Sequence, residues 1–428
     1  MTKLFKIFLT SLGFLYTTGA MAQSTGSSPY STFGLGELQE QSLPQFRAMG
    51  GIGTAVRRLG GYNNINLANP ASYADISLTT IDVGAQFHYM GMRQGSVSDK
   101  AFNGSLSHVA FAFPLFKRSA LSFGLLPYSN VGYNYQNSSS IDTSRANFIY
   151  SGEGGISKAY VGYAFGIGKN LSIGGNVSYL FGDIRQFRST EMPEVIGATN
   201  SRFEDNRSIY GFSYDYGIQY AIPVSKDNRI VIGYSGTAQS KINSKYNFLA
   251  YEYRKDGNGD ILSNRDTIAL TEGFRKILLP MTHKVGLSFE ASNRLLIGGE
   301  YRMGKWADLR EGEQSSGLNN TMGFSLGGQL TPNLNAVSGY YNLVDYRLGV
   351  KYDKLYYNVN NNDIKQYAVT AGFGFPLKND RFAYYKVNVT FEYGQRGALT
   401  DNLVKENYFN MHLGFLLNDL WFRKRQYD

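Results

Sequence analysis

The sequence predicts an all-β protein, a 14-stranded antiparallel transmembrane β-barrel with an N-terminal plug segment. Three observations support this prediction. The chain of 428 residues is rich in Tyr (33), Phe (28) and Gly (49) and has no Cys. Segments in which apolar and polar residues alternate recur along it. Short turns and long polar loops alternate between these segments, as they do in an up-and-down barrel of the outer membrane.

The first 22 residues have the organisation of a signal peptide. Two lysines give a positive start, residues 7–16 form a short apolar core, and residues 20–22 (Ala-Met-Ala) make a small-residue cleavage site. The mature chain is therefore expected to begin at Gln23 and to lie in a bacterial outer membrane. No later stretch approaches the roughly 20 apolar residues of a spanning helix, so insertion must use strands.

Composition excludes several classes of site and partner. Without cysteine the chain has no disulfide, thiolate metal site, thiol nucleophile or lipid-anchoring cysteine. A mean hydropathy of −0.28 fits a barrel wall, because half of each strand faces lipid and half faces a polar lumen. The net charge is +9, but Lys and Arg are spread among loops and strand ends. We therefore expect outer-membrane lipid and lipopolysaccharide as partners, and no nucleic acid.

Alternation is nearly complete in several segments. In residues 171–181 the odd positions are apolar or glycine and the even positions are mostly polar or small. Residues 386–393 and 409–415 show the same pattern, so each segment has one apolar face. Fourteen such segments are predicted, at 76–91, 103–114, 119–135, 146–166, 170–188, 208–223, 229–252, 267–291, 294–307, 320–330, 334–345, 365–375, 382–396 and 407–417.

The connections between these segments have two lengths. Six short turns are predicted at 115–119, 168–170, 225–228, 292–293, 331–333 and 376–381. Seven long polar loops are predicted at 92–101, 136–145, 189–207, 253–266, 308–319, 346–364 and 397–406. This alternation is required when both termini are periplasmic. A soluble β-sandwich or propeller is the alternative, but neither has a reason to alternate loop lengths or to carry strands of about 12 to 20 residues.

Residues 23–75 fall outside the strand pattern. They are rich in Gly, Ser and Asn, yet they carry enough apolar side chains to pack against a wall. We predict that they form a periplasmic plug, or hatch, in the mouth of a barrel formed by residues 76–417. A disordered secretion tail is the alternative. Residues 418–428 are predicted to be a basic periplasmic tail.

Two stretches of the plug segment resemble a known family. Residues 47–55 read Arg-Ala-Met-Gly-Gly-Ile-Gly-Thr-Ala, and residues 66–73 read Asn-Leu-Ala-Asn-Pro-Ala-Ser-Tyr, shortly before the first strand. Together they resemble the N-terminal hatch of the FadL family of outer-membrane transporters, whose signature triplet stands here as Asn69-Pro70-Ala71. The resemblance implies a plugged fourteen-stranded barrel that passes small hydrophobic, fatty-acid-like molecules.

Asn69, Pro70 and Ala71 are predicted to take part in gating or substrate passage. Pro70 fixes its own φ and biases Asn69 toward an extended conformation, while the Asn side chain can bond backbone groups of an irregular loop. The alternative is that the triplet only makes the corner at which plug becomes strand.

The third predicted strand has a proline near its middle. Pro127 cannot donate to the ladder, and a closed barrel offers no free edge, so a bulge or kink is predicted there. In the FadL family a kink in the third strand opens a lateral gap toward the membrane. The resemblance therefore implies that Pro127 and Gly132 mark such a gap, and an ordinary bulge is the alternative.

No catalytic, metal or cofactor site is predicted. The four histidines are accompanied by no G-x-S-x-G motif in a strand-to-helix context, so no enzyme activity is expected. Residues 256–260 have the carboxylate spacing of a calcium loop but lack the glycine and the final glutamate of that motif. No cofactor is expected.

Two functions are compatible with these patterns. The first is an outer-membrane channel or transporter that passes a small apolar ligand. The second is a non-enzymatic FadL-like accessory barrel subunit of an outer-membrane protein secretion or assembly machine, with outer-membrane proteins as partners. Residues 28–36, rich in Ser and Tyr, and the basic tail would then be docking segments.

Overall fold

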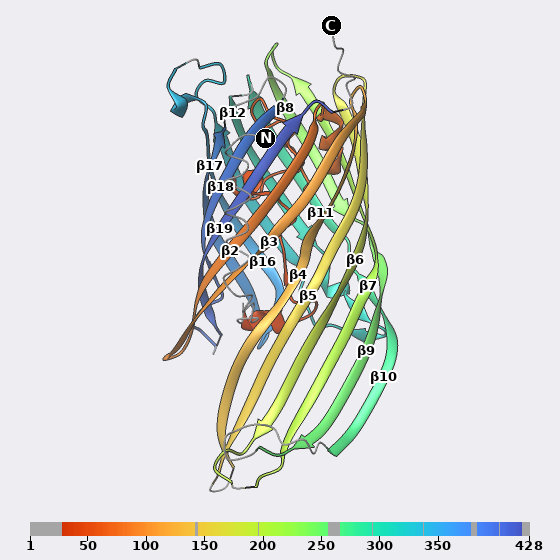
Figure 1. Cartoon of the computed structure of the whole chain (residues 1–428), viewed down its shortest axis with the longest axis vertical. Coiled ribbons are helices and arrows are strands. Elements are labelled where there is room, and N and C mark those ends of the chain that lie inside the picture. Colours follow the sequence, from red (N-terminus) through yellow and green to blue (C-terminus); the bar gives the residue numbers. More distant parts are fainter. Residues whose placement is uncertain are drawn as a thin grey trace.

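Fourteen antiparallel wall strands close into one barrel (Figure 1). The computed structural model describes residues 28–141, 144–195, 197–255, 266–292, 294–336, 338–377, 383–401 and 403–421. The last strand, β19 (Lys405–Asp419), pairs with the first wall strand, β2 (Thr79–Gln94). Closure lets the wall satisfy its backbone groups internally, as hydrocarbon requires. The predicted fold class is confirmed.

The sheet has 19 strand segments, because two wall strands are interrupted and three short pieces join the ladder. β8 and β9 together form one wall strand, as do β10 and β11. The remaining wall segments are β3 (Val97–Phe116), β4 (Ser119–Ile141), β5 (Ser144–Ile167), β6 (Leu171–Glu191), β7 (Asn200–Pro223), β8 (Asn228–Thr237), β9 (Ser240–Tyr253), β10 (Asp266–Leu279), β11 (Thr282–Ala291), β12 (Leu295–Gly304), β15 (Thr321–Leu330), β16 (Asp345–Val359), β17 (Asn362–Pro376) and β18 (Ala383–Arg396). The short pieces are β1 (Glu37–Leu38), β13 (Arg310–Glu311) and β14 (Gln314–Ser315).

Side chains along each strand alternate between the outer surface and the lumen. In β7, Phe212, Tyr214 and Tyr216 are exposed on the outside, whereas Ser213 and Gln219 are buried inside. This is the period-two pattern that the sequence predicts. It places an aromatic belt toward lipid and a polar lining toward the lumen.

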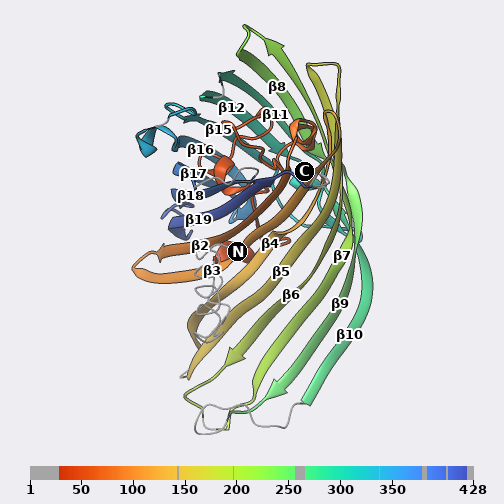
Figure 2. The ribbon, with the colours of Figure 1, turned by 45° about the horizontal axis from the view of Figure 1, so that its top comes forward.

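One side of the wall is much taller than the other (Figures 1 and 2). β8, β11, β12 and β15 have 10 residues each, close to the roughly 9–11 residues of a bilayer-spanning strand. β5 and β7 have 24 residues each. The ends of β4 to β7 that lie farther from the C-terminus, with β9 and β10, therefore extend past this belt (Figure 1). We name these parts the projecting sheet.

The eleventh wall strand lies elsewhere than the sequence predicts. Residues 334–345, predicted as a strand, lie mostly in the connection from β15 to β16, which contains the 3-10 helix η4 (Tyr340–Asn342). The predicted short turn at 331–333 is thus the start of a long connection. The predicted long loop at 346–364 is wrong, since most of it is β16, which ends in a tight turn where Asn360 and Asn361 have φ values of 51° and 61°.

The charged inner face of β16 explains this error. The side chains of Asp345, Arg347 and Lys351 point into the barrel and are buried. In the sequence, charged residues at this spacing are typical of a solvent-exposed loop. The other face carries the apolar residues Leu348 and Val350, which are exposed on the outside. Buried charges are tolerated here because each has an oppositely charged partner within the barrel.

The N-terminal residues 28–76, the interior segment, lie inside the barrel. They form η1 (Pro29–Thr32), β1, α2 (Pro44–Arg47), η2 (Pro70–Asp75) and irregular links. Hydrogen bonds reach separate parts of the wall: Thr390 Oγ1 donates to the Pro44 carbonyl at 2.7 Å, and Gly53 N donates to Glu300 at 2.9 Å. The apolar side chains pack inward as expected, and the buried ones include Leu43, Phe46, Met49, Ile52, Val56 and Leu59.

Three predicted features lie outside the described residues: the signal peptide 1–22, the calcium-like stretch 256–260, and residues 422–428 of the basic tail. The barrel predicted over 76–417 corresponds to a wall that runs from Thr79 to Asp419. Among the described residues, no helix is long and apolar enough to cross a membrane.

Candidate functional site

The triplet at residues 69–71 lies at the start of η2. Asn69 caps this helix by accepting a hydrogen bond from the Ala71 N–H at 3.0 Å. Its amide also donates to the carbonyls of Thr54 at 2.8 Å, Ile218 at 3.2 Å and Tyr234 at 3.3 Å. The side chain is fully buried. The triplet therefore fastens the interior segment to β7 and β8, and its role in gating stays a prediction.

Two inward glycines of the wall make room for the triplet. A Cβ atom at Gly217 would overlap the side-chain oxygen of Asn69, and one at Gly174 would lie 2.6 Å from the Pro70 carbonyl oxygen. Any larger residue at either position would push the triplet off the wall. Glycine at inward-facing strand positions is the sequence signal that could have located this contact.

Asn69→Ala is expected to lower the free energy of unfolding by about 1–3 kcal/mol, because it leaves buried carbonyls without their donor. Guanidinium-induced unfolding in lipid vesicles measures the loss. Asn64→Ala is the matched control, since the Asn64 amide bonds only the nearby carbonyls of Leu59 and Tyr62 and is half-buried. Equal losses in both variants would show that Asn69 has no special anchoring role.

β3 and β4 separate beyond the pair Val109↔Leu125. In the described chain, residues 97–108 of β3 and 126–141 of β4 form no register pairs with each other, and we name this gap in the ladder the seam. The interior segment takes the place of β3 there, because β1 pairs with β4. The wall is therefore completed at the seam by a strand that is not part of the barrel.

Pro127 and Gly132 both lie on the seam. The register of β4 against β5 shifts between Pro127 and Ser129, so the predicted bulge is confirmed. The Pro127 carbonyl accepts from Gln41 Nε2 at 3.1 Å, and the Gly132 carbonyl accepts from Ser28 N at 2.9 Å. The interior segment thus holds both residues. Their part in substrate passage stays a prediction.

A cavity of about 620 Å³ lies between the interior segment and the wall. Its lining includes β1, Pro127 and the buried His412, whose two ring nitrogens have no hydrogen-bond partner among the described residues. The lining also includes Leu106 of β3, which is 55% exposed, and Phe87 of β2, which is 37% exposed. Since Leu106 and Pro127 lie on the two sides of the seam, the cavity reaches the wall where β3 and β4 are unpaired.

Charged groups are numerous around this cavity. Most are paired: Lys158 Nζ lies 2.7 Å from Asp215, and Arg302 lies 2.9 Å from Asp353. The Lys284 side chain has no ion pair or hydrogen bond in the described part of the chain. The cations of the lining are Arg47, Lys158, Lys284, Arg302, Lys351, Lys354 and Arg396, and the acids are Glu37, Glu40, Asp215, Asp353 and Glu392.

Glu40 of the interior segment is one of the acids that form an ion pair at this cavity. Its carboxylate lies 3.1 Å from Lys351 Nζ on β16. Burial alone would raise the pKa of Glu40, but the nearby charges of Lys351, Arg47 and Arg302 outweigh burial and hold that pKa well below its usual range. Glu40 is therefore ionised at neutral pH and ties the interior segment to the wall.

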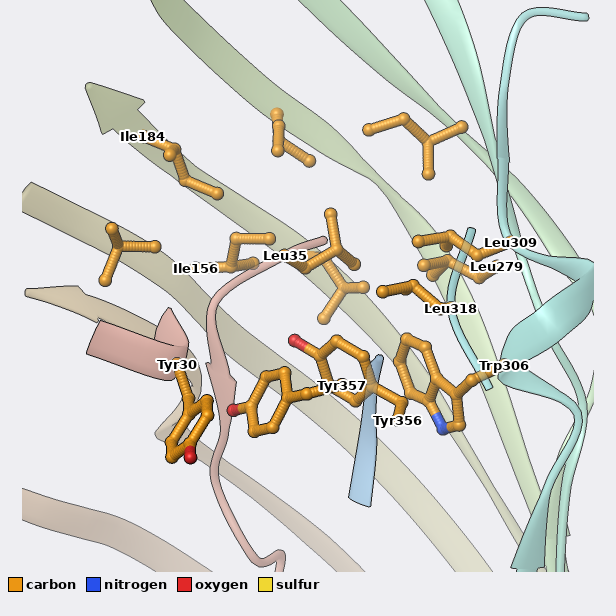
Figure 3. Packing of buried hydrophobic residues seen from close by; sticks show 14 of the residues in the cluster. Tyr30, Leu35, Ile156, Ile184, Leu279, Trp306, Leu309, Leu318, Tyr356 and Tyr357 are labelled. Carbon is orange, nitrogen blue, oxygen red and sulfur yellow. The ribbon is translucent and has the colours of Figure 1, made fainter. Parts of the chain in front are cut away.

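An aromatic and aliphatic cluster packs the start of the interior segment against the wall (Figure 3). The rings of Tyr30 and Tyr357 stack with centroids 5.8 Å apart, and Tyr356 stacks on Trp306 at 5.1 Å. The Tyr30 hydroxyl donates to the Val404 carbonyl at 2.6 Å. The start of the interior segment is thus buried against the wall. Residues 28–36, expected as a docking segment, are mostly enclosed here rather than displayed.

A second charged group is buried apart from the cavity. Asp345 accepts from Arg347 at 2.6 Å, Lys386 at 2.7 Å and Thr331 at 2.7 Å, and its side chain has no exposed surface. Arg347 lies on the same strand as Asp345, Lys386 lies on β18, and Thr331 lies in the connection before β16. Sequence reading missed this group because it requires the correct strand at 345–359.

The described residues contain no group of three or more His, Asp or Glu side chains that could hold a metal ion. The histidines are spread over different strands. His108 is paired with Asp82 at 3.0 Å in a buried contact outside the cavity lining. His283 lies 2.8 Å from the Tyr234 hydroxyl.

Comparison with solved structures identifies similar folds. The CymD monoaromatic hydrocarbon channel matches with a TM-score of 0.56 and 13% identity, covering 92% of this chain and 100% of that one. The toluene transporter TodX of P. putida gives 0.59 and 14%, covering 90% and 100%. A FadL homologue of Pseudomonas aeruginosa gives 0.60 and 11%, covering 90% and 100%. The FadL-like barrel fold predicted from the hatch motif is therefore confirmed. Closed antiparallel barrels of this kind are typical of outer membranes.

Sequence comparison gives a separate result. No curated protein matches the chain. The model of one family, described as BamG, matches residues 1–428. This name differs from that of the family suggested by the triplet, although the fold is shared. Since the match spans the whole chain, the protein belongs to the BamG family.

Proposed function

We propose that the protein passes small molecules with an apolar body and a polar end between the barrel interior and the outer membrane, through the seam between β3 and β4. The position of the cavity carries this proposal, because its lining includes Leu106 of β3 and Pro127 of β4, which lie on the two sides of the seam. Two proteins of similar fold are a monoaromatic hydrocarbon channel and a toluene transporter, which supports the same class of function. Passage of this kind needs no chemical step and no cofactor.

The interior segment is the proposed gate. β1 occupies the position at the edge of β4 that β3 would otherwise take. Gly36 precedes β1 with a φ of 91°, and a Cβ atom there would lie 2.6 Å from the Asn130 carbonyl oxygen. Release of this two-residue strand would open the seam while leaving the rest of the wall paired.

The chemistry of the lining sets the proposed ligand class. A hydrocarbon alone would leave the charges around the cavity without new partners. A molecule with a carboxylate could offer a partner to Lys284, a cavity cation whose side chain has neither an ion pair nor a hydrogen bond in the described chain. Its apolar body would lie against Phe87 and Leu106 at the seam.

Locking β1 to β4 is expected to abolish uptake. Leu38 and Ser129 are register partners, and directly opposed residues bring their Cβ atoms within disulfide reach. The natural chain has no cysteine, so Leu38→Cys with Ser129→Cys gives the single possible bridge. Uptake of radiolabelled oleate is measured in cells that lack their own fatty-acid channel.

The oxidised pair should transport less than a tenth of the wild-type rate, and reductant should restore it. Leu38→Cys alone is the control for the substitution. Unchanged uptake with a fully formed disulfide would show that the ligand does not leave past β1.

Lys284→Met is expected to raise the KM for oleate about tenfold, because a hydrogen bond to a charged group contributes roughly 1.5–3 kcal/mol. Uptake of toluene should be unaffected, since it carries no charge. Lys241→Met is the matched control, because Lys241 is exposed on the projecting sheet. If both ligands respond equally to Lys284→Met, the lysine has a structural role only.

A second function, an accessory subunit of an outer-membrane protein secretion or assembly machine, is favoured by the family match and by the projecting sheet. Transport through the bilayer does not require strands of 24 residues, whereas a partner outside the bilayer could use them. Purification in mild detergent tests this reading. Stoichiometric protein partners with an empty cavity would support it, and a co-purified amphipathic small molecule without partners would support transport.

A further inference from the structure

β10 has a long free edge. On one side it pairs with β9 from Asp266 to Leu279. On the other side, within the described residues, it pairs only at Ile277 and Leu278, with β13. Residues 266–275 therefore form the open margin of the projecting sheet, which is visible as the outermost strand in Figure 2.

The backbone at this margin is oriented for pairing. Gly312 N donates to the Lys276 carbonyl at 2.8 Å, so the backbone groups of Lys276 point toward the margin. Successive residues of a strand direct these groups to opposite sides. The N–H and C=O groups of Phe274, Glu272 and Leu270 therefore point the same way as those of Lys276, and an added strand could bond them.

The side chains at the margin are apolar and exposed. Phe274 is 71% exposed, Ile268 60% and Leu270 59%. Proteins usually protect an edge strand with proline, a bulge or a covering segment. From Ala269 to Leu279 the β10 strand has no proline and keeps a regular register with β9, and its register shift lies between Thr267 and Ala269. Residues 269–275 of this edge therefore have neither a proline nor a bulge.

The opposite margin of the projecting sheet is different. There β4 is covered by β1 at Ser129 and Asn130, and farther along it presents Asn137 and the serines 138–140. Exposed polar residues do not favour association. Of the two margins, that of β10 is the one suited to a partner.

Two geometric facts restrict what can bind. β11 already supplies the 10 residues that span the bilayer, so β10 lies outside the hydrocarbon and lipid tails cannot cover it. Two copies in one membrane share their orientation, so their β10 strands run in the same direction. A two-fold axis along the membrane normal cannot pair such edges in an antiparallel ladder. A second copy is therefore a poor occupant.

We propose that the β10 edge binds an extended segment of a different outer-membrane or surface protein, which adds to the projecting sheet as a further strand. This inference rests on the accessory-subunit function. Lys241, Lys245 and Lys276 lie on the outer face beside the edge, and in the described chain they form no ion pair. The partner segment is thus expected to combine alternating apolar residues with acidic ones.

The test uses the full-length protein in its native outer membrane. A photo-reactive phenylalanine analogue replaces Phe274, and mass spectrometry identifies the cross-linked peptide. The comparison position is Phe203, which is 39% exposed on the inner face of β7 in the same sheet. One discrete adduct is expected at 274 and absent at 203, and its peptide should be an extended segment with alternating apolar residues and at least one acid.

Glu272→Pro removes an edge N–H while sparing the bonds to β9, and Glu272→Ala removes only the side chain. The proline variant is expected to lose at least nine-tenths of the adduct, whereas the alanine variant should keep it. Heat-modifiability in SDS gels confirms that both barrels are folded. A self-adduct, an adduct within the chain, or an adduct that survives Glu272→Pro would overturn the proposal. Partners that co-purify equally with Glu272→Pro would overturn the edge site while leaving the accessory-subunit function intact.

Discussion

Replacing Asp345 with Asn is expected to lower the free energy of unfolding by about 3–5 kcal/mol, because removing one partner of a buried ion pair leaves the other charge uncompensated. Arg347 and Lys386, both buried, would lose the carboxylate that lies 2.6 Å and 2.7 Å away. Guanidinium-induced unfolding in lipid vesicles measures the change.

Two further variants test this explanation. Lys386→Met in the Asp345→Asn background should recover part of the loss, since Arg347 still has the neutral acceptors Gln329 and Asn388 at 2.7 Å and 2.8 Å. Asp363→Asn breaks a more exposed pair with Lys354, and exposed pairs contribute at most about 1 kcal/mol. If Asp363→Asn destabilises as much as Asp345→Asn, burial is not the cause.

Replacing Gly349 with Val is expected to dislodge the interior segment and open an aqueous path through the barrel. A Cβ atom at Gly349 would overlap the backbone at Met49 and Gly50. The strand cannot retreat, because it is paired on both sides with β15 and β17. The segment must therefore move inward, and its hydrogen bond from Gly50 N to Thr370 at 2.9 Å is lost.

Single-channel recording in planar bilayers measures the expected effect. The wild-type protein should show few openings, and Gly349→Val should show frequent openings with sustained conductance. Gly91→Val is the control, because the nearest atom to a Cβ there is the Asn407 carbonyl oxygen at 3.9 Å. Folding of both variants is checked by heat-modifiability. A folded Gly349→Val barrel that stays closed would show that the interior segment is not what blocks the lumen.

Pro127 and Asn69 show which features of the site can be predicted from a local sequence pattern and which cannot. Pro127 is locally incompatible with a ladder, so its bulge follows from the sequence. The sequence could not reveal that β1, some ninety residues earlier, pairs with β4 beside that bulge. Likewise the Asn-Pro pair predicts a fixed turn, but the carbonyls that Asn69 binds belong to strands about 150 residues later. Such contacts depend on the closed wall.

The sequence by itself determined the fold class, the position of thirteen of the fourteen wall strands to within several residues, and the inward packing of the N-terminal apolar side chains. These features follow from period-two alternation and from the turn residues between strands, which are local. It failed at β16, where charged side chains face the lumen and only their partners on β16 itself and on β18 make burial favourable. The tertiary structure alone decided the seam, the charged cavity and the free edge of β10, because each arises from which strands stop pairing, and pairing joins residues far apart in the chain.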